Sequence, residues 1–140
     1  MKMTKQKLIA NLNKDIEWEY SAAIQYVQHA SMITGAKYGS IQKELLVHAQ
    51  EELQHAVMVS DQVSYLGGTP SVKVEKIKTS KNSFQMLKHD LEGERLAIKM
   101  YKQRIGQAEA LKMYGLRRIL EDILIQEEEH ERDILTVTED

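Results

Sequence analysis

Glu52-Leu53-Gln54-His55 and its later counterpart Glu127-Glu128-Glu129-His130 are the stretches that decide the fold of this chain. Each places a carboxylate and an imidazole three residues apart, and such residues share one face of an α-helix. Another glutamate, Glu19 or Glu94, precedes each pair by 33 residues, so the whole arrangement recurs with an offset of 75 residues. Two helical hairpins of the same design would each bring one Glu and one Glu-x-x-His to a shared centre.

These six side chains are a complete ligand set for two adjacent divalent metal ions. Burying four ionised carboxylates together would be very costly without cations, and two divalent ions balance their charge. Mixed carboxylate and imidazole ligation suits iron, manganese or zinc, whereas a structural zinc site usually needs four ligands around one ion. Six shared ligands leave open positions for oxygen, peroxide or water, which indicates redox or hydrolytic chemistry. The expected metal ligands are Glu19, Glu52, His55, Glu94, Glu127 and His130.

The repeat extends to residues around the ligands. Tyr26 and Tyr101 each lie seven residues after an upstream glutamate, on the same helical face. They are candidate catalytic residues, which would hydrogen-bond a ligand carboxylate or be oxidised during turnover; the alternative is simple packing in the core. Asp15, Asp90 and Glu51 are candidates to accept the remaining ring N–H of the ligand histidines, or else are surface acids.

Two other side chains attract attention near the ligands. His48 lies one turn before Glu52 and either touches a path to the site or is a partly exposed helix histidine. Trp18 adjoins Glu19 but faces another direction, so we expect it at an interface or in a surface groove. The seven methionines are scattered, which favours a role as core fillers.

The chain is expected to form a single all-α domain over residues 1–140, because it has one proline and no short alternating apolar runs. Helical periodicity predicts helices over about residues 4–34, 39–66, 82–110 and 114–137, with a crossover at 67–81. The short connections make each pair of helices antiparallel. The crossover is long enough to return along the bundle, so the third helix would start parallel to the second. We expect Val72-Lys73-Val74 to lie against the bundle rather than in a sheet.

Composition excludes several classes of function. There are no cysteines, which excludes disulfides, thiolate zinc sites and iron–sulfur clusters. The net charge is −2 with both signs interspersed, so neither a nucleic-acid nor a membrane surface is indicated. No leader peptide and no apolar span of membrane length is evident, and a cytoplasmic location is the expectation.

At these residues the chain resembles the ferritin-like diiron carboxylate proteins, and bacterioferritin most of all, over about residues 8–135. The resemblance implies a ferritin-like four-helix bundle that oxidises ferrous iron with dioxygen or hydrogen peroxide. It also implies that Glu52 and Glu127 bridge two iron ions, that Glu19 and His55 bind one of them, and that Glu94 and His130 bind the other. The resemblance rests on Leu12-Asn13, Glu19, Ala22, Gln25-Tyr26, His29-Ala30, Glu52 to Ala56, Leu66 to Pro70, Met86-Leu87, Asp90-Leu91, Glu94 and Glu127 to His130.

Three departures from the family patterns refine these expectations. Bacterioferritin binds haem through a methionine at the position of Leu53, so we expect no haem. The chain ends at Asp140 without room for the fifth helix of ferritins, which favours a homo-oligomer such as a dimer over a cage of 24 subunits. Rubrerythrins carry an extra glutamate at the position of Ala97, and its absence weakens a peroxidase function.

Three functions remain open on the sequence. The first is a ferroxidase that handles iron, with Fe(II) and dioxygen or peroxide as its partners. The second is a peroxide-reducing diiron or dimanganese protein of rubrerythrin or catalase type, which the paired tyrosines would suit. The third is a helical binding module that metal braces without any turnover.

Overall fold

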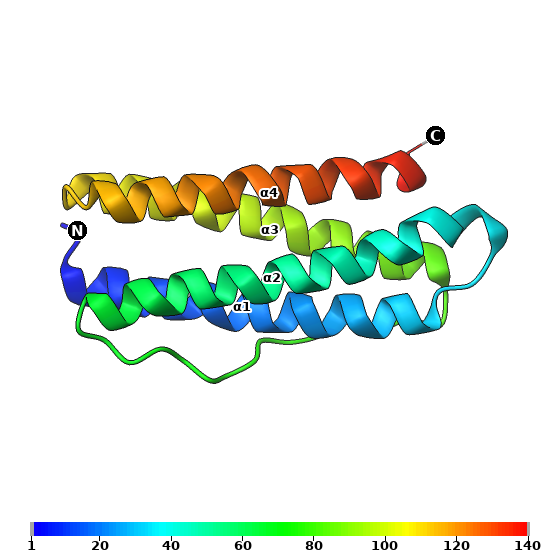
Figure 1. Ribbon diagram of the computed structural model, residues 1–140, viewed down its shortest axis with the longest axis horizontal. Helices are drawn as coiled ribbons and strands as arrows, with labels where there is room; N and C mark the ends of the chain where they lie inside the picture. Colours follow the sequence, from blue (N-terminus) through cyan, green and yellow to red (C-terminus); the bar gives the residue numbers. More distant parts are fainter. Residues whose placement is uncertain (1, 140) are drawn as a thin grey trace.

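Four long helices make up the computed structural model, which describes residues 2–139 (Figure 1). They are α1 (Lys5–Met32), α2 (Gly39–Tyr65), α3 (Ser83–Ala110) and α4 (Tyr114–Thr138), and a short 3-10 helix, η1 (Ala36–Tyr38), precedes α2. The described residues contain no strand. The expected fold class, two antiparallel hairpins joined by one long crossover, is confirmed.

Local chemistry explains where the helices begin and end. The Thr4 hydroxyl accepts a hydrogen bond from the Lys7 amide at 3.2 Å, and the Asn82 side chain caps α3 in the same way at 2.8 Å from the Gln85 amide. Helix α1 ends at Met32, two residues before the expected end, because Ile33 adopts an extended backbone.

The end of α2 depends on Gly67 and Gly68. Gly67 has a φ of 91°, a left-handed conformation that favours glycine. The Gly68 amide then donates to the Val63 carbonyl at 2.9 Å, which closes the helix. A Cβ on Gly68 would lie 2.6 Å from the Ile9 side chain, so the absence of a side chain lets the turn pack against α1.

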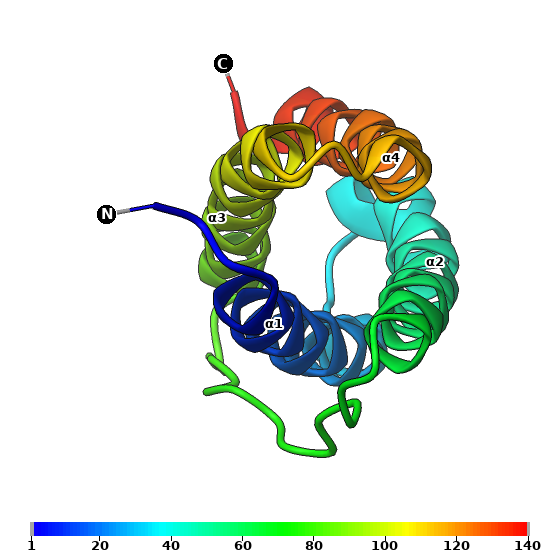
Figure 2. The ribbon, with the colours of Figure 1, turned by 90° about the vertical axis from the view of Figure 1, so that its left-hand side faces the viewer.

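The crossover from α2 to α3 follows the outer side of α1 (Figure 2). The Asn13 side-chain amide donates to the Thr69 carbonyl, and the Ser21 hydroxyl donates to the Lys76 carbonyl, each at 3.0 Å. The segment contains no strand, as expected, although Val72 points outward with 88% of its surface exposed. This route delivers α3 to the far end of the bundle, parallel to α2.

Two apolar clusters fill the two ends of the bundle. One is built around Leu12, Val63 and Leu120, and the other around Leu45, Leu87 and Ile134. Buried acidic residues interrupt the apolar core between these clusters. Within residues 2–139, no helix is long and apolar enough to cross a membrane.

Candidate metal centre

The six expected ligands meet between the two apolar clusters, with α1 and α3 giving one glutamate each and α2 and α4 one Glu-x-x-His each. None of the six residues is more than 2% exposed. They form two overlapping groups, Glu19-Glu52-His55-Glu127 and Glu52-Glu94-Glu127-His130, in which the potential ligand atoms lie within 4.8 Å of one another. The spacing read from the sequence therefore brings all six side chains together.

Glu52 and Glu127 occupy the middle of the cluster. Glu52 Oε1 lies 3.4 Å from His55 Nδ1 and 3.2 Å from His130 Nδ1. Glu127 Oε1 lies 3.3 Å and 3.4 Å from the same two nitrogens. Each of these carboxylates therefore faces both imidazoles, which is the position from which a carboxylate can bridge two ions.

Glu19 and Glu94 lie at the two outer ends. Glu19 Oε2 is 3.1 Å from His55 Nδ1, and Glu94 Oε1 is 3.3 Å from His130 Nδ1. Each outer carboxylate thus faces one imidazole. The cluster divides into two halves with corresponding ligands, as the 75-residue repeat predicts.

The carboxyl groups carry strongly raised pKa values. Burial raises the pKa of Glu94 to about 7, and the nearby charge of Glu127 adds to the effect. Burial also raises the pKa of Glu127 to about 8, together with repulsion from Glu52. The pKa of Glu19 lies well above its ordinary value for the same two reasons. Carboxyl groups of the metal-free cluster therefore retain protons, which reduce its negative charge as metal cations would.

The pKa values of the two imidazoles are also raised, although here burial opposes the rise. Burial alone would lower the pKa of His130, but the neighbouring carboxylates of Glu52 and Glu94 raise it to about 12. The pKa of His55 is likewise raised against the effect of burial by its carboxylate neighbours, Glu127 first among them. Protons and imidazolium charges therefore balance the carboxylates in the absence of metal.

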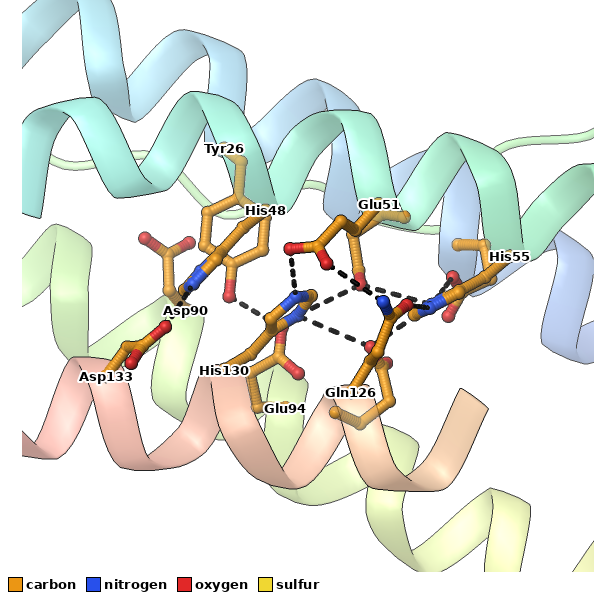
Figure 3. Close-up of polar contacts among 12 residues, drawn as sticks. Tyr26, His48, Glu51, His55, Asp90, Glu94, Gln126, His130 and Asp133 are labelled. Carbon is orange, nitrogen blue, oxygen red and sulfur yellow. Dashed lines mark hydrogen bonds and ion pairs between the residues drawn. The ribbon is translucent and has the colours of Figure 1, made fainter. Parts of the chain in front are cut away.

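Each histidine is oriented from behind by a residue of the opposite hairpin (Figure 3). The His130 Nε2–H donates to Glu51 Oε1 at 3.1 Å, and the His55 Nε2–H donates to Gln126 Oε1. The Gln126 amide in turn donates to Glu51 Oε2 at 3.0 Å. These bonds leave both Nδ1 atoms directed at the carboxylates. Gln126 was not expected from the sequence, although the 75-residue offset relates it to Glu51.

The expected role of Asp15 and Asp90 is wrong, since neither contacts His55 or His130. Asp15 accepts two hydrogen bonds from the Arg104 guanidinium at 2.7 Å, and Asp90 contacts His29 Nδ1 at 2.9 Å. Both aspartates are buried rather than at the surface. The two pairs are related by the same repeat, and each ties α1 to α3 on one side of the cluster.

The two tyrosines lie beside the cluster but differ in their contacts. The Tyr26 hydroxyl donates to Glu94 Oε1 at 2.6 Å. The Tyr101 hydroxyl is buried and has no hydrogen-bond partner among residues 2–139. Burial, together with nearby carboxylates, raises the pKa of both phenols well above the ordinary value. Of the two phenols, only that of Tyr26 therefore hydrogen-bonds an expected metal ligand within the described residues.

His48 is buried, not partly exposed, with 1% of its surface accessible. Its ring stacks on His130 with centroids 4.0 Å apart, and its Nε2–H donates to Asp133 at 3.0 Å (Figure 3). Burial lowers the pKa of His48, and the neighbouring His130 lowers it further. A neutral His48 ring thus packs against the outer side of the cluster.

The ferritin-like domain family matches residues 9–140 of the sequence. This chain belongs to the ferritin-like family. The match covers all four helices, so the resemblance to diiron carboxylate proteins noted from the sequence is confirmed.

Known relatives agree with this assignment. A bacterioferritin of Desulfovibrio desulfuricans is 26% identical over 127 residues, which cover 90% of this chain and 71% of the relative. A nutrient stress-induced DNA-binding protein of Nostoc sp. is 26% identical over 116 residues, covering 76% of this chain and 63% of that protein's length.

Two solved structures are also similar. A ferritin-like, diiron-carboxylate protein from Bacillus anthracis superposes with a TM-score of 0.93 at 29% identity, covering 99% of both chains. A dodecameric thioferritin from Bacteroides fragilis, a bacterioferritin-related protein, has a TM-score of 0.89 at 29% identity and covers 97% of this chain and 86% of its own. The chain therefore belongs to a ferritin-like, iron-handling family and has a buried Glu/His cluster that could hold a metal ion.

Proposed function

We propose that this chain is a ferroxidase, which binds two ferrous ions and oxidises them with dioxygen or hydrogen peroxide. The observation that carries the proposal is the position of Glu52 and Glu127, each within 3.4 Å of both imidazole Nδ1 atoms. A site for a single ion would not require two carboxylates that each face both imidazoles. Manganese is a second metal that the donor set suits.

The unpaired buried oxygens support a cation in the cluster. Glu94 Oε2 and Glu127 Oε2 make neither a hydrogen bond nor an ion pair within residues 2–139. Glu52 Oε1 and Glu127 Oε1 meet the imidazole nitrogens at 3.2–3.4 Å but form no hydrogen bond. Buried carboxylate oxygens without partners are costly, and metal ions would satisfy them. In this proposal both ions would share Glu52 and Glu127. Glu19 and His55 would hold one ion, and Glu94 and His130 would hold the other.

The two iron ions would supply one electron each, which with two protons convert dioxygen to hydrogen peroxide or hydrogen peroxide to two water molecules. Glu51 and Gln126 hold the imidazoles with Nδ1 free for metal. Tyr26 holds Glu94 in place through its hydroxyl, which donates to Oε1. We assign Tyr101, which lies near Glu19, a different catalytic role: its phenol is a group that can be oxidised during turnover.

The test is a titration of metal-free protein with ferrous iron, first without oxygen and then with each oxidant. Two ions per chain should bind, and both should be oxidised rapidly. Glu52→Ala and His130→Ala should abolish the oxidation. Metal analysis that finds a single zinc ion per chain would refute the proposal.

Peroxide reduction is the alternative enzyme function, and the two buried tyrosines beside the cluster favour it. Reaction of the reduced protein with peroxide much faster than with dioxygen, followed by turnover with an external reductase, would support it. A protein that binds two iron ions but reacts with neither oxidant would instead act as a metal-braced binding module.

The remaining features of the proposal concern assembly and location. We propose a homo-oligomer, at least a dimer, since a structural neighbour is described as a dodecamer. We propose no haem, because Leu53 stands on an exposed face of α2 and offers no ligand atom. The Nostoc relative is named for DNA binding. We propose a cytoplasmic protein without a nucleic-acid partner, because the net charge is −2 and no basic stripe is present in the sequence.

A further inference from the structure

A cavity of about 90 Å³ lies between α1 and α3, on the side of the bundle covered by the crossover. Its walls are largely apolar, and small residues line them on both helices. Ala22 of α1 and Ala97 of α3 lie in it, together with Trp18 and Gly93. Trp18 thus lies in a groove, as its position in the sequence suggested.

The inner end of the cavity is formed by the carboxylate cluster. Glu19, Glu52 and Glu94 line it, whereas His55 and His130 do not. Two of the buried oxygens without hydrogen-bond partners, Glu52 Oε1 and Glu94 Oε2, belong to these lining residues. The cavity therefore reaches the centre from the carboxylate side, opposite to the side held by the imidazoles.

The 75-residue repeat explains why the space exists. Ala22 and Ala97 are equivalent positions, each three residues after an outer carboxylate ligand, and both side chains are small. Trp18 is equivalent to Gly93, so an indole on α1 is matched by no side chain on α3. A Cβ on Gly93 would meet no atom within 4 Å. The two hairpins are alike in backbone but leave a gap at this point.

The crossover fixes one wall of the cavity. Lys76 and Lys78 line it, and both are tied to α1 through their backbone. The Ser21 hydroxyl donates to the Lys76 carbonyl at 3.0 Å, and the Lys78 amide donates to Gln25 Oε1 at 2.8 Å. The wall is therefore anchored by hydrogen bonds rather than left as a loose loop.

We propose that this cavity is the port through which a small uncharged oxidant, dioxygen or hydrogen peroxide, reaches the dinuclear centre. The cavity is smaller than the roughly 150 Å³ cavity that takes benzene, so it suits molecules of a few heavy atoms. Its largely apolar walls favour an uncharged molecule over a hydrated ferrous ion, which would lose water along these walls before it reached the carboxylates at the inner end. The identity of the guest as an oxidant rests on the ferroxidase function proposed above.

Xenon is the first probe, because it is apolar and comparable in size to dioxygen. Crystals of the metal-free protein under xenon pressure should show an atom between Ala22 and Ala97. Gly93→Trp restores the indole that the repeat would place on α3 and should remove the xenon. Gly106→Trp is the matched control, because Gly106 is another helical glycine of α3 with open space around it. It should leave the xenon in place.

The rate of oxidation is the second readout. With two ferrous ions bound, Gly93→Trp and the smaller change Ala97→Leu should each slow the reaction with oxidant about tenfold or more. Anaerobic binding should still give two ions per chain in both variants. Gly106→Trp and Ala10→Leu, an exposed alanine of α1, should react at the wild-type rate.

The outcomes separate this inference from the ferroxidase proposal. A cavity without xenon in the wild-type crystal overturns the port. The port is also overturned if the indole of Gly93→Trp fills the cavity in the crystal but the variant oxidises iron at the wild-type rate. A wild-type protein that oxidises no iron defeats the ferroxidase proposal, and the xenon occupancy then decides by itself whether the cavity admits small apolar molecules.

Discussion

Replacing Glu127 by glutamine should stabilise the metal-free protein while destroying the dinuclear site. The carboxyl group is fully buried, and its pKa rises from an ordinary 4.5 to about 8. A raised pKa means that the folded state holds the proton more tightly than the unfolded chain does. The stability gained from that proton is present at low pH and is lost as the pH rises from 4.5 through about 8.

The magnitude follows from the difference between these two pKa values. Each pKa unit corresponds to about 1.4 kcal/mol, so ionised Glu127 costs up to about 5 kcal/mol at pH 9. A buried amide whose hydrogen bonds are incomplete costs about 1–3 kcal/mol, and this cost reduces the gain from removing the charge. We therefore expect Glu127→Gln to raise the free energy of unfolding by about 2–4 kcal/mol at pH 9. Near pH 4, where Glu127 is protonated, only the amide penalty remains, and the variant should be less stable than the wild type by about 1–3 kcal/mol.

Urea unfolding with a chelator present, at several pH values, measures this difference. Glu129→Gln is the control, because Glu129 is an exposed glutamate of the same helix and should change stability by less than about 0.5 kcal/mol. Calorimetric titration with a divalent metal should show that Glu127→Gln no longer binds two ions. A variant less stable than the wild type at pH 9, or one that still binds two ions, would refute the reasoning.

Three further outcomes follow from the structure. The melting temperature of the metal-free protein should fall from pH 5 to pH 8, because the raised pKa values of Glu94 and His130 bind protons more tightly in the folded state, and calorimetry that shows a rise would contradict this. Arg104→Met leaves Asp15 buried without a partner and should lower the free energy of unfolding in urea by about 3–5 kcal/mol. Adding Asp15→Asn should recover most of this loss. A double variant as unstable as the single variant would argue against the Asp15–Arg104 ion pair. Tyr26→Phe removes the hydrogen bond to Glu94 and should cost about 1 kcal/mol and slow iron oxidation in stopped-flow measurements, with two ions still bound.

The sequence predicted the helices and the cluster because both depend on periodicity. A Glu-x-x-His pair on a helix fixes which face turns inward, and the repeat shows that a second hairpin supplies the other half. Side-chain partners across helices are a different matter. Asp15 and Asp90 lie at plausible positions along the chain, yet they contact Arg104 and His29 instead of the ligand histidines. Which acid meets which base depends on distances between helices, which spacing along one helix does not define.

The same limit explains the errors at His48 and Gln126. His48 is polar and one turn from a ligand, so only the packing of α4 against α2 shows that its ring is covered by His130. The sequence does contain a signal for Gln126, because the 75-residue offset relates it to Glu51. Because a neutral amide takes the place of the carboxylate there, a pattern of carboxylates and imidazoles does not include Gln126.

The contrast between Glu51 and Gln126 makes the two halves of the centre chemically unequal. His130 is backed by an anion, which strengthens an imidazole as an electron donor, whereas His55 is backed by a neutral amide. Two ions bound here would therefore occupy unlike sites, with the tighter one beside His130. We expect stepwise filling of the centre, so that a half-loaded protein accumulates before the second ion arrives and electron transfer can begin.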